Sequence, residues 1–143
     1  MNGGFLVSKI KQLSDRVFER LLARQGIDAF NGAQGRILYV LWQEDGVSIK
    51  TISERCGLAI TSLTTMLERM ENQGLIRRVP SEQDKRKTLL YLTDQAKKLR
   101  ADSEVVSGQM RDVFYRDFTA AEIEQFETYL NRVRTNLEEW RKA

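Results

Sequence analysis

The sequence predicts a mainly α-helical protein that carries one small β-hairpin. Three features support this: long stretches with apolar residues every three or four positions, two short apolar runs joined by a charged loop at residues 81–87, and two short helical patterns separated by a glycine just before those runs. With 143 residues and 41% hydrophobic content, the chain is long enough to bury one core.

Two helices are expected in the first 45 residues. The first is amphipathic, since its apolar residues recur at helical spacing: Phe5, Ile10, Leu13, Val17 and Leu21. The second begins at a capping box that runs from Asn31 to Gln34, in which each side chain can bond to the backbone of the other residue.

Two short helices with a glycine between them are expected next. Ser48 is suited to cap a helix that ends near Arg55, and Gly57 interrupts the pattern before a second helix from about Ile60 to Gln73. This order matches the helix-turn-helix plan. Gly74 is expected to close the second helix in a left-handed conformation. One stripe of that helix is expected to be buried: Ile60, Leu63, Leu67 and Met70.

Small hydroxyl residues lie on the opposite face of the second helix, near its start. Such a face can approach the major groove closely, donate to phosphates or base edges, and offer methyl groups to thymine. Taken alone, these residues would more often be caps or solvent-facing side chains, but the neighbouring helix and basic hairpin favour DNA contact. The expected contacts are Thr61, Ser62, Thr64, Thr65 and Arg69, with Ser48 and Lys50 on the DNA backbone.

The hairpin is predicted from the β-branched, aromatic and aliphatic residues on both sides of its loop. Residues 75–79, LIRRV, precede the loop and residues 88–92, TLLYL, follow it. The loop from Ser81 to Lys87 holds two acidic and three basic residues, so it must project into water or onto a charged partner. An isolated loop of this kind is more often only solvated, but after a helix-turn-helix pattern it indicates the wing of a winged helix. The expected wing contacts with DNA are Arg77, Lys85, Arg86 and Lys87.

The distribution of charge agrees with this interpretation better than the total does. The net charge of the whole chain is only +3. Residues 48–100 carry 11 Lys and Arg and 6 Asp and Glu, a net +5, whereas the remainder carries 12 and 14, a net −2. A basic centre between neutral or acidic ends is typical of a DNA-facing module joined to a protein-facing scaffold.

Two long helices are expected after the hairpin. One runs from about Asp94 to Asp117, with Gly108 as a bend or close-packing point. The other starts at a capping box, Thr119 to Glu122. Together with the N-terminal helix they could complete an intramolecular core, but their apolar area exceeds what one small winged domain needs, which favours an intertwined homodimer. Its expected interface is a seam in the last helix: Ile123, Phe126, Leu130, Val133, Leu137 and Trp140.

Residues 60–76, ITSLTTMLERMENQGLI, and the wing that follows resemble the MarR family of bacterial transcription regulators. That family also has an N-terminal helix and two long C-terminal helices that build a dimer, so the resemblance covers nearly the whole chain. Its wing motif commonly reads Asp-Pro-x-Asp-Arg-Arg, then Leu-Thr-x-x-Gly. Here Ser81 and Glu82 replace the Asp-Pro pair, and Ala96 replaces the Gly. The wing residues that match are Asp84, Lys85, Arg86, Leu90, Leu92 and Thr93.

The resemblance implies a winged helix-turn-helix lobe at residues 31–93, an N-terminal dimerisation helix at residues 1–30, and C-terminal dimerisation helices at residues 94–143. It implies that Arg86 reaches into the minor groove and that Asp84 orients it through a charge-assisted hydrogen bond. It also implies a homodimeric repressor that binds a palindromic operator of double-stranded DNA and is released by a small-molecule effector.

The effector and its pocket are not assigned from the sequence. Residues at helical spacing more often pack in a core than contact a ligand. This applies to each of the candidate pocket residues: Phe30, Arg36, Tyr39, Trp42, Met110 and Phe114.

Composition disfavours several other chemistries. The chain has no His, which removes Ser-His and Cys-His dyads and the commonest ligand of transition metals, so neither an enzyme nor a metal site is expected. No Gly-rich phosphate loop is present, and no cofactor is expected. The single Cys cannot form an internal disulfide, and no signal-like start or long apolar run is present, so a cytoplasmic protein without a membrane segment is expected.

Two alternatives remain open. A winged helix can also serve as a protein-interaction module, in which case the basic hairpin would dock an acidic partner. Cys56 is expected to be a buried thiol at the turn between the two short helices, but a thiol-based redox sensor would need it exposed with a low pKa, and Arg55 is the local reason to consider this.

Overall fold

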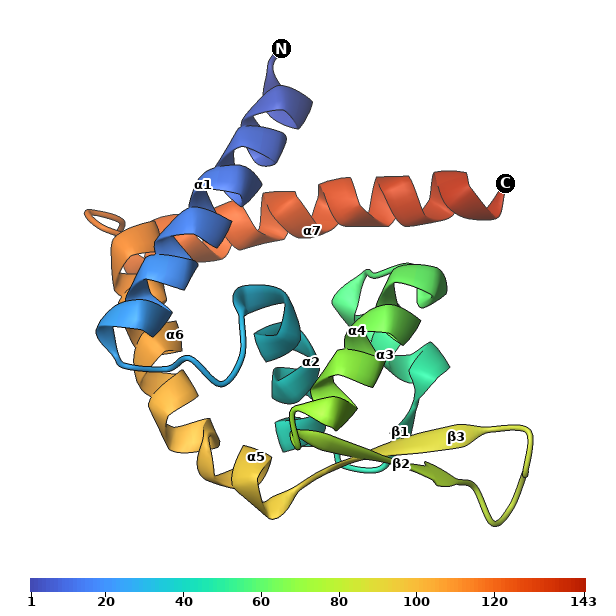
Figure 1. Cartoon of the computed structure of the whole chain (residues 1–143). Coiled ribbons are helices and arrows are strands. Elements are labelled where there is room, and N and C mark those ends of the chain that lie inside the picture. Colours follow the sequence, from blue (N-terminus) through green and yellow to red (C-terminus); the bar gives the residue numbers. More distant parts are fainter. The chain divides into compact units, whose positions relative to one another are not determined.

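Seven helices and three short strands make up the computed structural model, which describes residues 1–143 (Figure 1). The predicted mainly α fold with one β-hairpin is confirmed. The chain forms two compact units, Met1–Met110 and Arg111–Ala143, whereas the functional division at residues 30 and 93 stays a prediction. The elements are α1 (Gly3–Arg24), α2 (Gly32–Gln43), β1 (Val47–Ser48), α3 (Ile49–Cys56), α4 (Ile60–Asn72), β2 (Ile76–Pro80), β3 (Thr88–Leu92), α5 (Asp94–Lys98), α6 (Arg100–Phe114) and α7 (Ala120–Lys142).

The predicted helix starts are confirmed by the hydrogen bonds that cap them. At α2, Gln34 N–H donates to Asn31 Oδ1 at 2.8 Å and Asn31 N–H donates to Gln34 Oε1 at 3.1 Å, which completes the capping box. At α3, Thr51 N–H donates to the Ser48 hydroxyl at 3.2 Å. These bonds satisfy backbone donors that the first turn of a helix leaves unpaired.

Two glycines end the short helices as predicted. Gly57 has φ 68° after α3 and Gly74 has φ 76° after α4, both in the left-handed region that side chains with a Cβ rarely adopt. Leu75 N–H then donates to Met70 O at 2.9 Å, and the Leu75 side chain is buried. The chain therefore turns directly from α4 into the hairpin.

The predicted buried stripe of α4 is correct except at Ile60. Leu63, Leu67 and Met70 are at most 1% exposed, whereas Ile60 is 54% exposed. Ile60 is the first residue of α4, so it lies at the helix end, outside the part that packs into the core. Spacing alone does not show where a helix leaves its core.

The sheet has a third strand that the sequence did not reveal. β3 is the central strand and pairs antiparallel with β1 on one side and β2 on the other, with Val47 opposite Leu90 and Ile76 opposite Leu92. Asp45 Oδ1 accepts Leu92 N–H at 2.8 Å just before β1. Gly46 is needed there because it has φ 71° and a Cβ would lie 2.7 Å from the Tyr91 ring.

The core of the first unit lies between α2, α3, α4 and the sheet. Trp42 closes it at one end: its ring packs edge-on against Phe30 with centroids 6.3 Å apart, and its Nε1–H donates to Ala96 O at 3.0 Å. The largest fully buried side chains are Leu22, Ile37, Leu38, Leu41, Ile52, Leu63, Leu67, Met70, Leu75, Ile76, Leu90 and Val106.

The prediction of a single helix from Asp94 to Asp117 is wrong. It is broken at Leu99 into α5 and α6, and α6 continues through Gly108. Leu99 N–H donates to Ala96 O at 3.2 Å, a tighter turn than an α-helix makes. Near the break, Ala96 is fully buried and its carbonyl accepts a hydrogen bond from Trp42, a tertiary contact that the helical pattern of the sequence does not encode.

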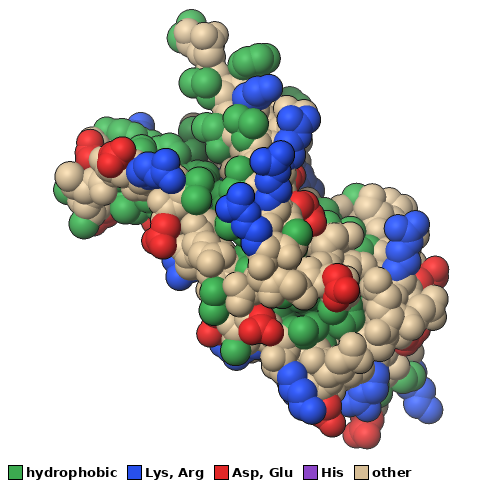
Figure 2. Space-filling view, turned by 60° about the vertical axis from the view of Figure 1, so that its left-hand side comes forward, with side chains coloured by type: hydrophobic (Ala, Val, Ile, Leu, Met, Phe, Trp, Pro, Cys, Tyr) green, Lys and Arg blue, Asp and Glu red, His purple; other side chains and the backbone are tan.

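Only the C-terminal part of α1 packs into the lobe core. Leu22 is 2% exposed, but the apolar residues of the first turns are open to solvent, and Figure 2 shows hydrophobic side chains on the surface of the projecting helix end at the top of the view. The exposed set is Phe5, Leu6, Val7, Ile10 and Leu13.

The second unit is a small aromatic cluster followed by the long helix α7. Tyr115 O–H donates to Glu127 Oε2 at 2.6 Å, and the predicted capping box at Thr119 is confirmed by a bond of 3.1 Å from Glu122 N–H. No residue of α7 is fully buried. The aromatic rings in mutual contact are Phe114, Tyr115, Phe118 and Phe126.

Candidate nucleic-acid interface

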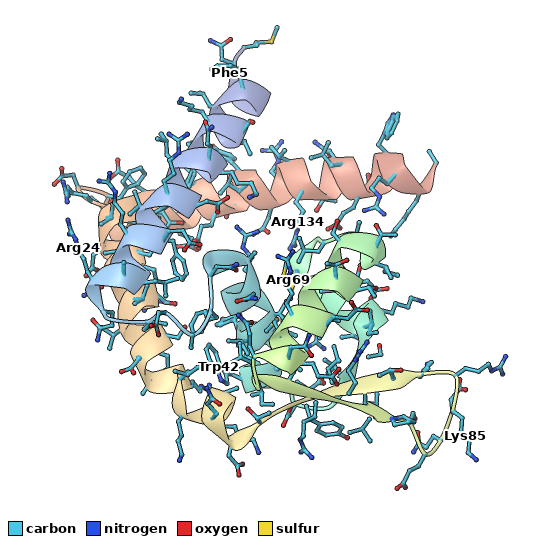
Figure 3. The ribbon with its side chains drawn as sticks, viewed as in Figure 1. Phe5, Arg24, Trp42, Arg69, Lys85 and Arg134 are labelled. Carbon is cyan, nitrogen blue, oxygen red and sulfur yellow. The ribbon has the colours of Figure 1, made fainter.

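The outward face of α4 is open to solvent at four of the five positions predicted to contact DNA: Thr61, Ser62, Thr65 and Arg69. Figure 3 shows Arg69 on this helix. Thr64 differs, because it is half-buried and its hydroxyl donates to Ile60 O at 2.8 Å. A hydroxyl engaged in this way has less capacity left for DNA. DNA contact by all five residues stays a prediction.

The loop at residues 81–87 is anchored at its base and open at its tip. Ser81 is buried, which corrects the expectation that the whole loop projects, and its N–H donates to Lys87 O at 2.9 Å. Ser81 also accepts Asp84 N–H through its hydroxyl at 3.3 Å. Lys85 stands at the tip (Figure 3). The anchored base sets the backbone path of a tip that remains free to bind.

Asp84 contacts Arg86 mainly through the backbone. Arg86 N–H donates to Asp84 Oδ1 at 3.0 Å, while the guanidinium Nε lies 3.6 Å from the same oxygen. The Arg86 side chain is 94% exposed, so its ion pair with Asp84 is weak and it can leave that pair for a phosphate or a base edge. Orientation of Arg86 by Asp84 on DNA stays a prediction.

The two arginines of β2 have different surroundings. Arg77 is exposed and forms no ion pair. Arg78 forms an ion pair with Glu71 of α4 at 3.0 Å, a contact that sequence reasoning missed. The hydrogen bond from Arg78 lowers the pKa of Glu71, and the same bond raises the pKa of Arg78. The signal available in the sequence was an acid and a base flanking the Gly74 turn.

Ser48 and Lys50 differ in how free their side chains are to contact DNA. The Ser48 hydroxyl already caps α3 and lies 3.0 Å from the Thr51 hydroxyl, whereas Lys50 is exposed. Of the two predicted backbone contacts, Lys50 is the one whose side chain is free.

A cavity of about 800 Å³ opens beside this lobe between α1, α2, α3 and α6. Its lining includes an ion-pair network in which the Asp15 carboxylate accepts hydrogen bonds from Lys11 Nζ at 2.8 Å and from Arg36 Nη2 at 3.0 Å. Of the six candidate pocket residues, three line the cavity: Arg36, Tyr39 and Met110. Phe30 and Trp42 belong to the core, and Phe114 belongs to the aromatic cluster near the start of α7. The cavity mixes charge with apolar surface, as small-molecule sites do.

Cys56 lines this cavity and is half-buried, which corrects the expectation of a buried thiol. Burial raises the pKa of its thiol, while the nearby positive charge of Arg36 acts in the opposite direction and more weakly. Arg55, the neighbour suspected from the sequence, is paired with Glu44 at 3.2 Å. The thiol is therefore protonated at neutral pH, which does not support a reactive thiolate.

The structure contains no group of three or more acidic, Cys or His side chains placed to hold a metal ion. None of its helices has both the length and the apolar character required to cross a bilayer.

Comparison with known proteins points to one family. Residues 30–88 match the model of the MarR family. A stretch of 71 residues is 38% identical to the organic hydroperoxide resistance transcriptional regulator of Bacillus subtilis and covers 50% of this chain and 48% of that protein. The chain spans about half the length of the curated relatives that it matches.

Two solved structures share the fold over nearly the whole chain. The PcaV transcriptional regulator from Streptomyces coelicolor, in complex with its natural ligand, is similar with a TM-score of 0.78 and 26% identity, over 92% of this chain and 91% of that chain. A mutant MarR from E. coli complexed with operator DNA has a TM-score of 0.82 and 24% identity, over 91% of both chains.

Proposed function

We propose that this chain, whose residues 30–88 match the MarR family model, is a sequence-specific transcription regulator of that family that binds double-stranded DNA as a homodimer in the bacterial cytoplasm. The observation that carries the proposal is the pairing of an exposed hydroxyl-rich face on α4 with a hairpin whose basic tip is anchored at its base and free at its end. The first suits a major groove and the second a phosphate backbone or minor groove.

In a homodimer, two copies of α4 would enter successive major grooves. A two-fold axis places them about 34 to 36 Å apart, which requires a palindromic operator. The hairpins would flank the site, each with Arg86 in the minor groove. Exposure of Arg86 in the free protein supports this role, because no buried contact has to break before it binds.

Exposed apolar surface supports the homodimer. On α7, Val133 is 50% exposed, Leu137 63% and Trp140 79%, all on one helix face. The first turns of α1 add Phe5 at 75%. Apolar surface of this extent marks an association site in soluble proteins. We assign it to a second copy of this chain, in agreement with the seam predicted from the sequence.

The cavity supports control by a small-molecule effector, and repression relieved by that effector is the form we propose. The PcaV structure holds the natural ligand of that regulator, which makes a ligand reasonable here. The Arg36 to Asp15 ion pair joins α2 of the lobe to α1 across the cavity, so an occupant could change how these helices are held. A coupling of roughly 1 to 3 kcal/mol would weaken DNA binding about 5- to 150-fold.

Fluorescence anisotropy tests the proposal. The purified protein is titrated against fragments of DNA upstream of its own gene and then against pooled genomic fragments, at about 50 and 200 mM salt, with nonspecific competitor. Tight binding that resists the competitor and falls roughly 10³- to 10⁵-fold between the two salts is expected if about 6 to 10 phosphates are contacted. Absence of binding to genomic fragments beyond the nonspecific control would contradict the proposal and favour a protein-docking module.

A further inference from the structure

Two adjacent arginines of β2 differ in their contacts: Arg78 is ion-paired and Arg77 is not. Arg77 and Arg78 point to opposite faces of the strand, because side chains alternate along it. Arg78 shares its face with the buried Ile76 and lies opposite Leu90, which is 0% exposed. That face packs against α4, whereas Arg77 lies opposite Tyr91 on the other face.

Glu71 holds Arg78 through three hydrogen bonds. Its Oε1 accepts Arg78 Nη2–H at 3.0 Å and Nε–H at 3.3 Å, and its Oε2 accepts the backbone N–H of Arg78 at 3.3 Å. Both carboxylate oxygens and two groups of the guanidinium are thus engaged. The two side chains are 33% and 37% exposed, less than in the other ion pairs of this protein. Several bonds in a fixed geometry constrain orientation more than a single ion pair does.

The bonds between Glu71 and Arg78 span the turn that joins α4 to β2. Glu71 lies in the last turn of α4 and Arg78 at the centre of β2, and the chain between them reverses at Gly74 with φ 76°. The connection has three residues, 73–75, and the Thr93 hydroxyl already holds it by donating to Gly74 O at 2.6 Å. The bonds of Glu71 add a second tie farther along the strand. The bond from Glu71 to the Arg78 backbone fixes the strand itself as well as the side chain.

We propose that Glu71 and Arg78 are positioning residues that set the angle between the helix α4 and the hairpin, and that Arg78 does not contact DNA phosphate. The inference rests on the proposed function, in which α4 and the hairpin must fit one operator together. Arg77, whose charge is unpaired, is the phosphate contact from this strand. The pair therefore acts on the fit to a specific site. The salt dependence of binding comes from other charges, among them Arg77 and the basic residues of the tip.

Three variants separate these roles. Glu71→Gln/Arg78→Gln removes the pair without changing net charge, so general attraction to DNA is preserved. Glu71→Arg/Arg78→Glu reverses the pair, again without a change in net charge. Arg77→Gln is the matched control on the neighbouring position, with one free charge removed.

Hydrogen exchange in the protein without DNA tests whether the pair holds the hairpin against α4. We expect the amides of residues 76–92 to exchange about threefold to fivefold faster in Glu71→Gln/Arg78→Gln. The reversed pair should regain only part of the protection, because it restores the ion pair but not the bond to the backbone N–H of residue 78. Arg77→Gln should leave exchange unchanged. Unchanged exchange in Glu71→Gln/Arg78→Gln would overturn the proposal whether or not the protein binds DNA.

DNA titrations test whether the pair affects operator binding without contacting phosphate. For Glu71→Gln/Arg78→Gln we expect operator affinity to fall about threefold to fivefold while nonspecific affinity and the salt slope stay as in the wild type. Arg77→Gln should weaken both kinds of binding and reduce the salt slope by about 1 per subunit. A reduced slope in Glu71→Gln/Arg78→Gln would identify Arg78 as a phosphate contact and overturn the inference. If the wild type bound no DNA, the proposed function would fail, and the exchange data would still decide whether the pair holds the hairpin.

Discussion

The lobe within residues 1–110 and the unit of residues 111–143 use the same spacing of apolar residues with opposite results. In α4, Leu63, Leu67 and Met70 follow steps of four and three and are at most 1% exposed. In α7, Leu130, Val133 and Leu137 follow steps of three and four and are 38%, 50% and 63% exposed. Helical spacing therefore identifies a face, but only contacts between elements decide whether that face is covered.

The difference follows from what each unit provides around the helix. The lobe surrounds α4 with α2, α3 and a three-stranded sheet, so its apolar stripe is closed within one unit. The C-terminal unit provides only a cluster of four aromatic rings near the start of α7. The rest of the seam is exposed.

Leu67→Ala tests whether the lobe core is self-sufficient. Leu67 is 1% exposed, and truncation of a fully buried Leu leaves a cavity, so we expect a loss of about 2 to 5 kcal/mol in the free energy of unfolding. Urea denaturation measures it. Ile60→Ala, on the same helix but 54% exposed, is the control and should cost less than about 1 kcal/mol. Equal losses would remove the distinction between the two positions.

Leu137→Glu tests whether the α7 seam is covered by a second copy. A carboxylate placed in an apolar interface loses water without gaining a partner, so we expect the dimer dissociation constant to rise about a hundredfold, equivalent to roughly 2.7 kcal/mol. Sedimentation equilibrium measures it. Thr135→Glu, on the opposite face of the helix, should leave the dimer intact. A Leu137→Glu protein that remained dimeric would place the interface elsewhere.

Arg86→Ala tests a residue of the lobe whose exposure we attribute to DNA binding, whereas that of the α7 seam is attributed to association. We expect operator binding to weaken by about 1 to 3 kcal/mol. The melting temperature should not change, because the side chain is 94% exposed in the free protein. Anisotropy and thermal unfolding give the two readouts. An unaltered operator affinity would take the wing out of the mechanism.

Alkaline titration tests whether the C-terminal unit has any core of its own. Desolvation, followed by the hydrogen bond to Glu127, raises the pKa of Tyr115 to about 12. Because the folded-state pKa is raised, the contribution of Tyr115 to stability is complete below the unfolded value of about 10 and is lost as pH rises towards 12. Absorbance at alkaline pH should show a late tyrosine step that is missing in Tyr115→Phe. Loss of the same step in a Glu127→Gln variant would mean that the carboxylate outweighs desolvation.

Local features of this fold could be predicted from the sequence. A cap depends on residues three positions apart, as at Asn31 and Gln34, and a left-handed turn depends on one glycine, as at Gly74. The hairpin was predictable for the same reason, since its loop and flanks are contiguous. The basic tip and the hydroxyl face of α4 followed directly from these elements.

Features that depend on distant residues were not predictable. The strand β1 has two residues and exists because β3 offers it a partner some 40 positions away, at Leu89 and Leu90. The break at Leu99 comes three residues after Ala96, whose carbonyl accepts a hydrogen bond from the distant Trp42. The pairing of Glu71 with Arg78 needed the strand register, which places Arg78 on the face towards α4.

The two tryptophans lie in contrasting environments, and this makes the chain its own optical reporter. Trp42 is tied into the lobe, since its indole N–H donates to Ala96 O at 3.0 Å and its carbonyl accepts Arg100 Nη1–H at 2.9 Å. Trp140 is 79% exposed near the end of α7. The tryptophan emission of a Trp140→Phe protein would come only from the junction of α2 with α5 and α6, and that of a Trp42→Phe protein only from the C-terminal seam. Movement at that junction and association of the seam could then be followed separately by fluorescence, without any attached dye.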